Sequence, residues 1–145
     1  MKTVSKGQQL NPTSPYGVVF LFHIGTLKDD RHGYYDSTRH YWDVIEKWRN
    51  RDNAIALGMI EGISVAGYQI QNWHQSPTIS EKFEFDGLDL GAQHELLDRD
   101  FKPVLERGKG FWARGGFIVV EFDGMGQFKL LRGAAAANKN AWIKL

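Results

Sequence analysis

Residues 53–73, NAIALGMIEGISVAGYQIQNW, decide the fold. Two apolar runs flank the dipeptide Glu61-Gly62, which is close to the Asp-Gly pair typical of β-hairpins. Glycine at the second position supplies the positive φ angle that a tight primed turn requires. The stretch therefore predicts two strands that are joined by a tight turn and pair with each other.

The second of these runs has the two-residue period of a strand. Ala66, Tyr68 and Ile70 fall on the same face of an extended chain. Gly67 lies between them, and a glycine inside a strand indicates a bulge or a close approach of the backbone to another segment. We expect the hairpin region to end at Pro77, because proline cannot donate a hydrogen bond to a strand ladder.

Strand-like segments lie on both sides of this hairpin. They are β-branched or aromatic runs bounded by turn residues, and they comprise residues 16–25, residues 81–90 and a further hairpin over residues 117–131. In the segment 81–90, Phe83 and Phe85 share one face and the acids between them share the other. For the tail, residues 132–145, a helical turn and a strand are both open.

The segment YYDSTRHYWDVIEKW, residues 34–48, predicts a helix. Asp36 or Ser37 is the expected N-cap, because its side chain can accept a hydrogen bond from a free backbone N–H group. Ile45 and Trp48 lie along one stripe of such a helix, so we expect both side chains in the core.

A second, shorter helix is expected at residues 91–105, broken near Pro103. The elements then number about six strands and two helices, with neighbouring strands linked by hairpins. This pattern favours an α+β fold with a small, curved, mostly antiparallel sheet or barrel rather than a doubly wound parallel sheet. We expect one domain over residues 16–145, preceded by a polar arm at residues 1–15.

The composition is that of an ordinary globular protein of 145 residues, with 42% apolar and 24% charged residues. There is no cysteine, which excludes disulfides, a thiol nucleophile and cysteine-ligated zinc. No apolar run is long enough to span a bilayer, so we expect a cytoplasmic protein without membrane contact.

The net charge of +1 conceals an uneven distribution along the chain. Residues 53–100 contain two cations and eight acids, a local charge of −6, whereas residues 101–145 contain eight cations and three acids, a local charge of +5. A uniformly basic coat for long nucleic acids is excluded, but a local basic patch is not.

The glycine-rich segment GKGFWARGG, residues 108–116, is the first candidate binding site. Glycines let the backbone approach a ligand, Lys109 and Arg114 carry charge suited to phosphate, and Trp112 offers a stacking surface. The alternative is a surface loop whose tryptophan packs into the core.

Two clusters of aromatic and polar residues form the second candidate. Tyr35 and Arg39 lie near the start of the predicted helix, and Trp73 and His74 follow a strand. Binding residues are common at such positions on a β scaffold. The alternative is a helix end packed by neighbouring rings.

Familiar catalytic and cofactor motifs are missing: the chain has no phosphate loop, no dinucleotide fingerprint, no nucleophile elbow and no His-Glu-x-x-His motif. We therefore expect no cofactor. A hydrolase remains an alternative, with His40 or His74 as acid or base and Glu84 or Asp86 as its partner. Otherwise these acids are expected to lie on a solvated strand edge.

The order of these segments resembles a prokaryotic module found C-terminal to GIY-YIG-type nuclease domains and also alone. The resemblance covers about residues 16–90 and depends on the following positions: Tyr35, Thr38, Arg39, Trp42, Gly62, Gly67, Tyr68, Trp73, Phe83, Phe85 and Gly87. The same order of elements is similar to PUA-like folds, in which an aromatic-lined cleft holds a nucleotide. The two strands of the nuclease itself are not found here.

The resemblance implies a PUA-like module that binds a nucleic acid or a modified nucleotide. RNA or DNA would be held over a short footprint, because the near-neutral charge provides few phosphate contacts. The alternatives are the nucleotide- or nucleic-acid-directed hydrolase or nuclease and a protein-interaction module of the toxin–antitoxin type. A homodimer is compatible with each of these functions.

Overall fold

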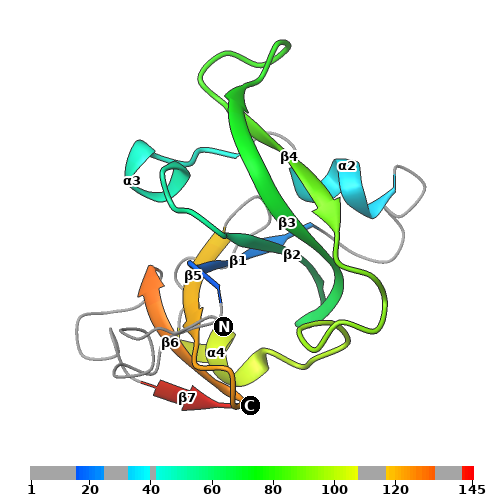
Figure 1. Cartoon of the computed structure of the whole chain (residues 1–145), viewed down its shortest axis with the longest axis vertical. Coiled ribbons are helices and arrows are strands. Elements are labelled where there is room, and N and C mark those ends of the chain that lie inside the picture. The colour runs from blue at the N-terminus through cyan, green and yellow to red at the C-terminus, as the bar shows by residue number, and fades with distance from the viewer. Residues whose placement is uncertain (1–15, 25–32, 40–41, 108–116, 133–141) are drawn as a thin grey trace, which may run out of the picture.

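Seven strands form one mixed sheet in the order β4-β3-β2-β1-β5-β6-β7 (Figure 1). The computed structural model describes residues 16–24, 33–39, 42–107, 117–132 and 142–145. Its elements are β1 (Val19–His23), α2 (Tyr34–Arg39), α3 (Glu46–Arg49), β2 (Ile55–Ile60), β3 (Ile63–Gln75), β4 (Phe83–Asp89), α4 (Lys102–Arg107), β5 (Phe117–Phe122), β6 (Gln127–Arg132) and β7 (Trp142–Lys144). The predicted polar arm at residues 1–15 lies outside the described residues.

The hairpin predicted at Glu61-Gly62 is confirmed. Strand β2 ends at Ile60, and β3 begins at Ile63, which is its partner in the antiparallel ladder. Glu61 has a φ angle of 53° and Gly62 a φ angle of 85°, so both turn residues adopt the left-handed conformation of a type I′ turn. The turn matches the right-handed twist of the two strands and therefore fixes their register.

Gly67 marks a close approach, as its position inside the strand predicted. A Cβ atom at this residue would lie within about 3 Å of side-chain carbons of Leu57, Leu90 and Leu97. The register shift lies nearby rather than at the glycine itself, between Gly58 and the next residue of β2. Close packing, rather than a bulge, therefore explains the glycine.

Five of the six strand pairings are antiparallel, in agreement with the expected α+β class. The exception joins β1 to β2, which run parallel and are connected through α2 and α3. In the described part of the chain β4 and β7 are the two edges of the sheet, which is not closed. The curved open sheet is therefore found, rather than a barrel.

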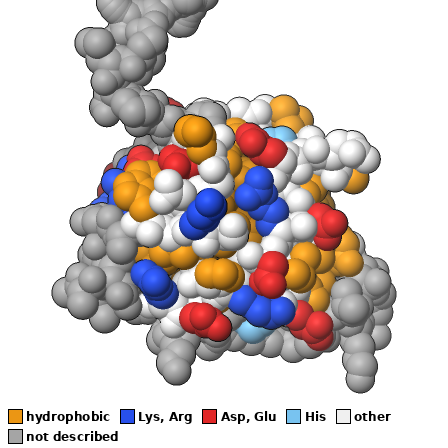
Figure 2. All heavy atoms as spheres, turned by 90° about the horizontal axis from the view of Figure 1, so that it is seen from below, with side chains coloured by type: hydrophobic (Ala, Val, Ile, Leu, Met, Phe, Trp, Pro, Cys, Tyr) orange, Lys and Arg blue, Asp and Glu red, His pale blue; other side chains and the backbone are white. Residues whose placement is uncertain are grey.

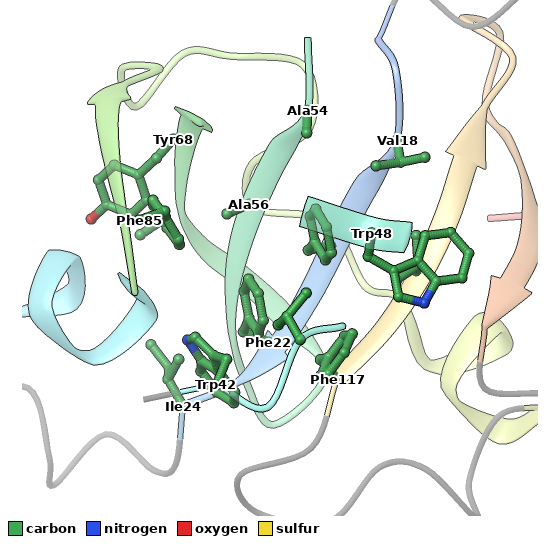
Figure 3. Packing of buried hydrophobic residues seen from close by; sticks show 14 of the residues in the cluster. Val18, Phe22, Ile24, Trp42, Trp48, Ala54, Ala56, Tyr68, Phe85 and Phe117 are labelled. Carbon is green, nitrogen blue, oxygen red and sulfur yellow. The ribbon is translucent and has the colours of Figure 1, made fainter. Parts of the chain in front are cut away.

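The sheet curls because β2 carries small side chains on its concave face. Ala54, Ala56 and Gly58 occupy this side, so the strands on either side of β2 can approach one another above it. The Trp73 ring on β3 lies edge-on to the Phe20 ring on β1, with 5.7 Å between the ring centroids. Figure 3 shows Phe22, Phe85 and Phe117 of the same core. The resulting aromatic core binds together strands that are not neighbours in the sheet.

The convex face of the sheet has a separate core. Alternate residues of β1, β2 and β5 point to this side and pack against α4 and the preceding turn. Phe101, immediately before α4, is fully buried and lies 5.0 Å from the ring centroid of Phe128 on β6. Both faces of the sheet are thus covered, which explains why β1 and β2 are almost entirely buried.

The single helix predicted at residues 34–48 is wrong. The structure has two short helices there, α2 and α3, and between them Trp42 pairs with Phe83. Ile45 has extended dihedral angles and is 59% exposed, whereas Trp48 is buried as expected. Pairing with β4 thus overrides the local helical pattern at this point.

The second predicted helix is also wrong over most of its length. Residues 91–100 form turns, and α4 begins only at Lys102, so Pro103 lies in its first turn, where a missing N–H group costs no hydrogen bond. The last residues of the tail form β7 rather than a helical turn. All three helices are short, and none in the described residues is both long and apolar enough to cross a membrane.

Gly58 provides a test of the packing between α2 and the sheet. A Cβ atom at this position would overlap Thr38 Oγ1 and lie 3.0 Å from Ile24 Cδ1. We predict that Gly58→Ala lowers the free energy of unfolding by about 1–3 kcal/mol, measured by urea denaturation. Thr38→Ala should reduce this penalty in a double-mutant cycle, because it removes the overlapping oxygen. A Gly58→Ala variant as stable as the parent would contradict this packing.

Candidate nucleic-acid interface

Residues 35–39 and Trp42 cover the outer edge of β4. The N–H groups of Trp42 and Phe83 each donate to the other residue's carbonyl oxygen, at 2.9 Å. Arg39 Nε donates to the carbonyl oxygen of Phe85 at 2.8 Å, and the Gly87 N–H group donates to the Tyr35 hydroxyl oxygen at 3.0 Å. Every second residue of this edge therefore has a partner, which protects the strand from pairing with another chain.

The Arg39 guanidinium continues from this edge into a charged cluster. Its Nη2 atom lies 2.9 Å from Asp86 Oδ1 and 3.5 Å from Glu84 Oε2. His74 Nε2 lies 3.4 Å from the same oxygen of Asp86 and 3.7 Å from that of Glu84. The structure therefore brings a histidine and two acids together, the arrangement on which the hydrolase alternative depends.

The prediction that Glu84 lies on a solvated edge is wrong. Glu84 is only 6% exposed, because the side chains of Arg39 and His74 lie against it. The Asp86 side chain remains 49% exposed. Buried carboxylates are retained where a cation compensates them, and Arg39 serves this purpose for Glu84.

The pKa of Asp86 is lowered. Partial desolvation is the largest single contribution and acts to raise the pKa of this carboxyl, but hydrogen bonds from Arg39 and His74, with their positive charges, outweigh it. Asp86 is therefore ionised throughout the neutral range. A phosphate group approaching Arg39 would meet two carboxylates that already hold this guanidinium.

Trp73 lies on the other face of β3 from His74. Its ring is partly buried and contacts Phe20 and Phe85 edge-on, with ring centroids 5.7 and 5.3 Å away. The accessible remainder of the indole belongs to the concave face of the sheet. Of the predicted binding residues, Tyr35, Arg39 and His74 thus come together, and Trp73 faces away from them.

The helix α3 and the turn that follows it place three cations around aromatic rings on this concave side. Lys47 Nζ lies 4.9 Å from the centroid of the Trp48 ring, and Arg51 Cζ lies 5.0 Å from it. Arg49 Cζ lies 3.8 Å above the ring of Phe83, a residue of β4, and Arg49 Nε donates to the carbonyl oxygen of Val44. These contacts hold the cations beside the far end of the β3–β4 pair.

Sequence reasoning did not select these three cations. Their signal was the alternation in residues 47–51, KWRNR, in which cations surround a tryptophan. The prediction of a single helix over residues 34–48 concealed it, because that helix ended before Arg49 and Arg51. We call Lys47, Arg49, Arg51, Trp48 and Phe83 the α3 cluster.

The part of β3 that extends beyond β2 carries a row of uncharged polar side chains. We call residues 70–75 of β3 together with residues 83–87 of β4 the arm, which projects past β2 in Figure 1. Four amide side chains along β3 are exposed, namely those of Gln69, Gln71, Asn72 and Gln75. With the half-exposed imidazole of His74, these groups can donate and accept hydrogen bonds without carrying charge.

The remaining predicted site residues cannot be placed against this arrangement. Lys109, Trp112 and Arg114 lie outside the described residues, as does His40.

On the face in Figure 2, cations and anions alternate with apolar side chains, and neither sign forms a continuous patch there. In the described part of the chain no group of three or more acids and histidines is arranged to hold a metal ion. Comparisons with protein-family models, curated proteins and solved structures give no match.

Removal of Arg39 tests the origin of the charged cluster. We predict that Arg39→Ala lowers the free energy of unfolding by about 1–3 kcal/mol, because it leaves the Glu84 carboxylate buried without its cation and the Phe85 carbonyl without its donor. Arg39→Lys should recover little of this free energy, since one ammonium group cannot bind both the Glu84 carboxylate and the Phe85 carbonyl. Adding Glu84→Gln to Arg39→Ala should restore part of the lost free energy of unfolding, measured by urea denaturation. Equal stability of Arg39→Ala and the parent would refute this role.

The pH dependence of stability tests the environment of Asp86. Because the pKa of this group is lower in the folded state, its contribution is present above the usual value of 3.8 and is lost as the pH falls through the folded pKa. We predict that Asp86→Asn lowers the urea midpoint at pH 7. The difference in urea midpoint between the variant and the parent should shrink as the pH falls below the usual pKa of 3.8. A difference that stays constant with pH would contradict the pKa shift.

Proposed function

We propose that the protein is a PUA-like module that binds a short segment of single-stranded RNA or DNA on the arm and the α3 cluster. The observation that carries the proposal is the set of three cations that α3 and the turn after it hold against aromatic rings beside the arm. Cations and rings in alternation are the combination that single-stranded nucleic acids require, because phosphates need charge and bases need stacking surfaces.

The α3 cluster supports phosphate contact more strongly than Arg39 does. Lys47 and Arg51 are exposed, and neither is engaged by a carboxylate within salt-bridge distance in the described residues. Arg39, by contrast, is held between Glu84 and Asp86. The acids of the charged cluster would repel a phosphate backbone, so the strand would run on the concave side of the arm, past α3.

Base recognition would come from the arm. Trp73 and Phe83 present partly buried rings on the concave side, and a base stacked on an aromatic ring contributes about 1–3 kcal/mol. The amides of Gln71 and Gln75, at the open margin of β3, can form paired hydrogen bonds with a base edge, as amide side chains do with adenine. The resemblance to PUA-like modules supports the same reading.

The small number of available cations limits the footprint. With two or three phosphate contacts, each contributing about −0.7 to the slope of log affinity against log salt, the slope for a single strand would be only about −1.4 to −2.1. Binding by this module would therefore depend on stacking and hydrogen bonds at least as much as on charge. A nucleotide with a modified base is a suitable ligand for the same reason.

The test is fluorescence anisotropy with a labelled single-stranded oligonucleotide of about 8 nucleotides. We predict that Lys47→Ala/Arg51→Ala weakens binding at least tenfold and reduces the salt slope by about 1.4, because two phosphate contacts are lost. The matched control is Lys102→Ala/Arg107→Ala, which removes two exposed cations from α4 on the convex side and should bind like the parent. Equal loss in both variants would indicate a general charge effect and contradict the site, as would no binding by the parent.

A further inference from the structure

The two sides of the arm differ in how their strand edges are covered. Tyr35, Arg39 and Trp42 form hydrogen bonds with the outer edge of β4, as described above. On the other side, pairing of β3 with β2 ends at Gln69, followed by one hydrogen bond from the Ile70 N–H group to the Ala54 carbonyl oxygen. Beyond this point β3 continues for five residues, Gln71–Gln75, with no strand on that side in the described part of the chain.

The register of the ladder identifies which backbone groups face this open side. Because Phe83 and Phe85 direct their N–H and carbonyl groups outward from β4, their partners Gln75 and Trp73 direct theirs away from β4 as well. In the described residues no hydrogen bond from another segment reaches the backbone of Trp73 or Gln75. These groups form a short template to which a further strand can add.

The sequence of this edge lacks the usual protection against pairing. Natural edge strands carry lysine, inward-pointing charges or proline, yet residues 62–80 contain no Asp, Glu, Lys or Arg at all. Pro77 lies past the end of β3 and leaves the edge itself unprotected. An uncharged strand can pair with an identical copy without electrostatic repulsion across the two-fold axis.

We propose that the open edge of β3 pairs with the same edge of a second copy of this chain, antiparallel and with its two-fold axis at Trp73. In this register Trp73 lies opposite its own counterpart, and Gln71 lies opposite Gln75 of the other copy. The pairing uses the whole open length of β3. This length begins after Ile70, which is bonded to Ala54, and finishes where β3 ends at Gln75. Two arms then form one continuous ribbon.

The dimer would be weak and concentration-dependent. Five residues of extended chain span about 17 Å, and a contact of this length buries less than the ~1,000 Å² typical of stable, specific interfaces. The interaction is carried by the backbone, so side-chain changes that keep the strand extended should leave it intact. This inference does not depend on nucleic-acid binding, although two joined arms would bring two binding faces together.

Sedimentation velocity of the full chain from low micromolar to submillimolar concentration tests the pairing. We expect the parent to shift from monomer toward dimer and Gln75→Pro to remain monomeric, because proline removes the outward N–H group without breaking the ladder to β4. The matched control, Gln75→Ala, keeps the N–H group and should dimerise like the parent. Far-UV circular dichroism checks that each variant is folded.

Amide hydrogen exchange locates the contact. We expect the amides of Trp73 and Gln75 to exchange rapidly at low protein concentration and to become protected as the dimer forms. A parent that stays monomeric at every concentration would overturn the proposal, whether the edge is bare or covered by another segment of the same chain. Dimerisation of Gln75→Pro, or a dimer that leaves the Trp73 amide unprotected, would overturn it as well.

Discussion

The hydrogen bonds that Tyr35, Arg39 and Trp42 form with the outer edge of β4 are the interaction on which the arrangement of the arm depends. Backbone groups at an edge must find partners or remain open to other chains. Here Tyr35, Arg39 and Trp42 provide these partners, and they come from a segment more than forty positions away in the chain. The same contacts hold α2 against the sheet and bring Arg39 to the acids of β4.

Curvature of the sheet has an equally simple cause. Small residues on the concave side of β2 let Trp73 and Phe85 approach the rings of β1, so aromatic packing spans strands that are not adjacent. The arm, α3 and the charged cluster then occupy fixed positions around this core. Alternation along β3 places His74 and the charged cluster on the convex side of the arm and Trp73 on its concave side.

Local signals in the sequence predicted the parts of the fold that depend on local chemistry. The turn at Glu61-Gly62, the strand around Phe85 and the α+β class follow from turn residues and alternation, and these are confirmed. The helix over residues 34–48 failed because Trp42 pairs with Phe83, a contact that no local pattern encodes. Glu84 appeared solvated for the same reason, since its cation lies 45 positions earlier in the chain.

In the candidate site, too, local sequence predicted some features, whereas others depend on contacts between distant segments. Tyr35, Arg39 and His74 were selected by residue type and do come together, but Tyr35 and Arg39 act there first as partners of the β4 edge. The cations of the α3 cluster were not selected from the sequence, yet they surround rings at the arm. Residue type thus identified the groups able to bind a ligand, whereas their actual surroundings depended on contacts between distant segments.

The account is tested most directly by hydrogen exchange at Gly87, whose amide donates to the Tyr35 hydroxyl. Tyr35→Phe removes this single acceptor and leaves the aromatic packing in place. We predict that the Gly87 amide then exchanges faster, while the amide of Phe83, which donates to the Trp42 carbonyl, keeps its protection. An unchanged rate at Gly87 in the folded variant would contradict the claim that α2 holds the edge of β4.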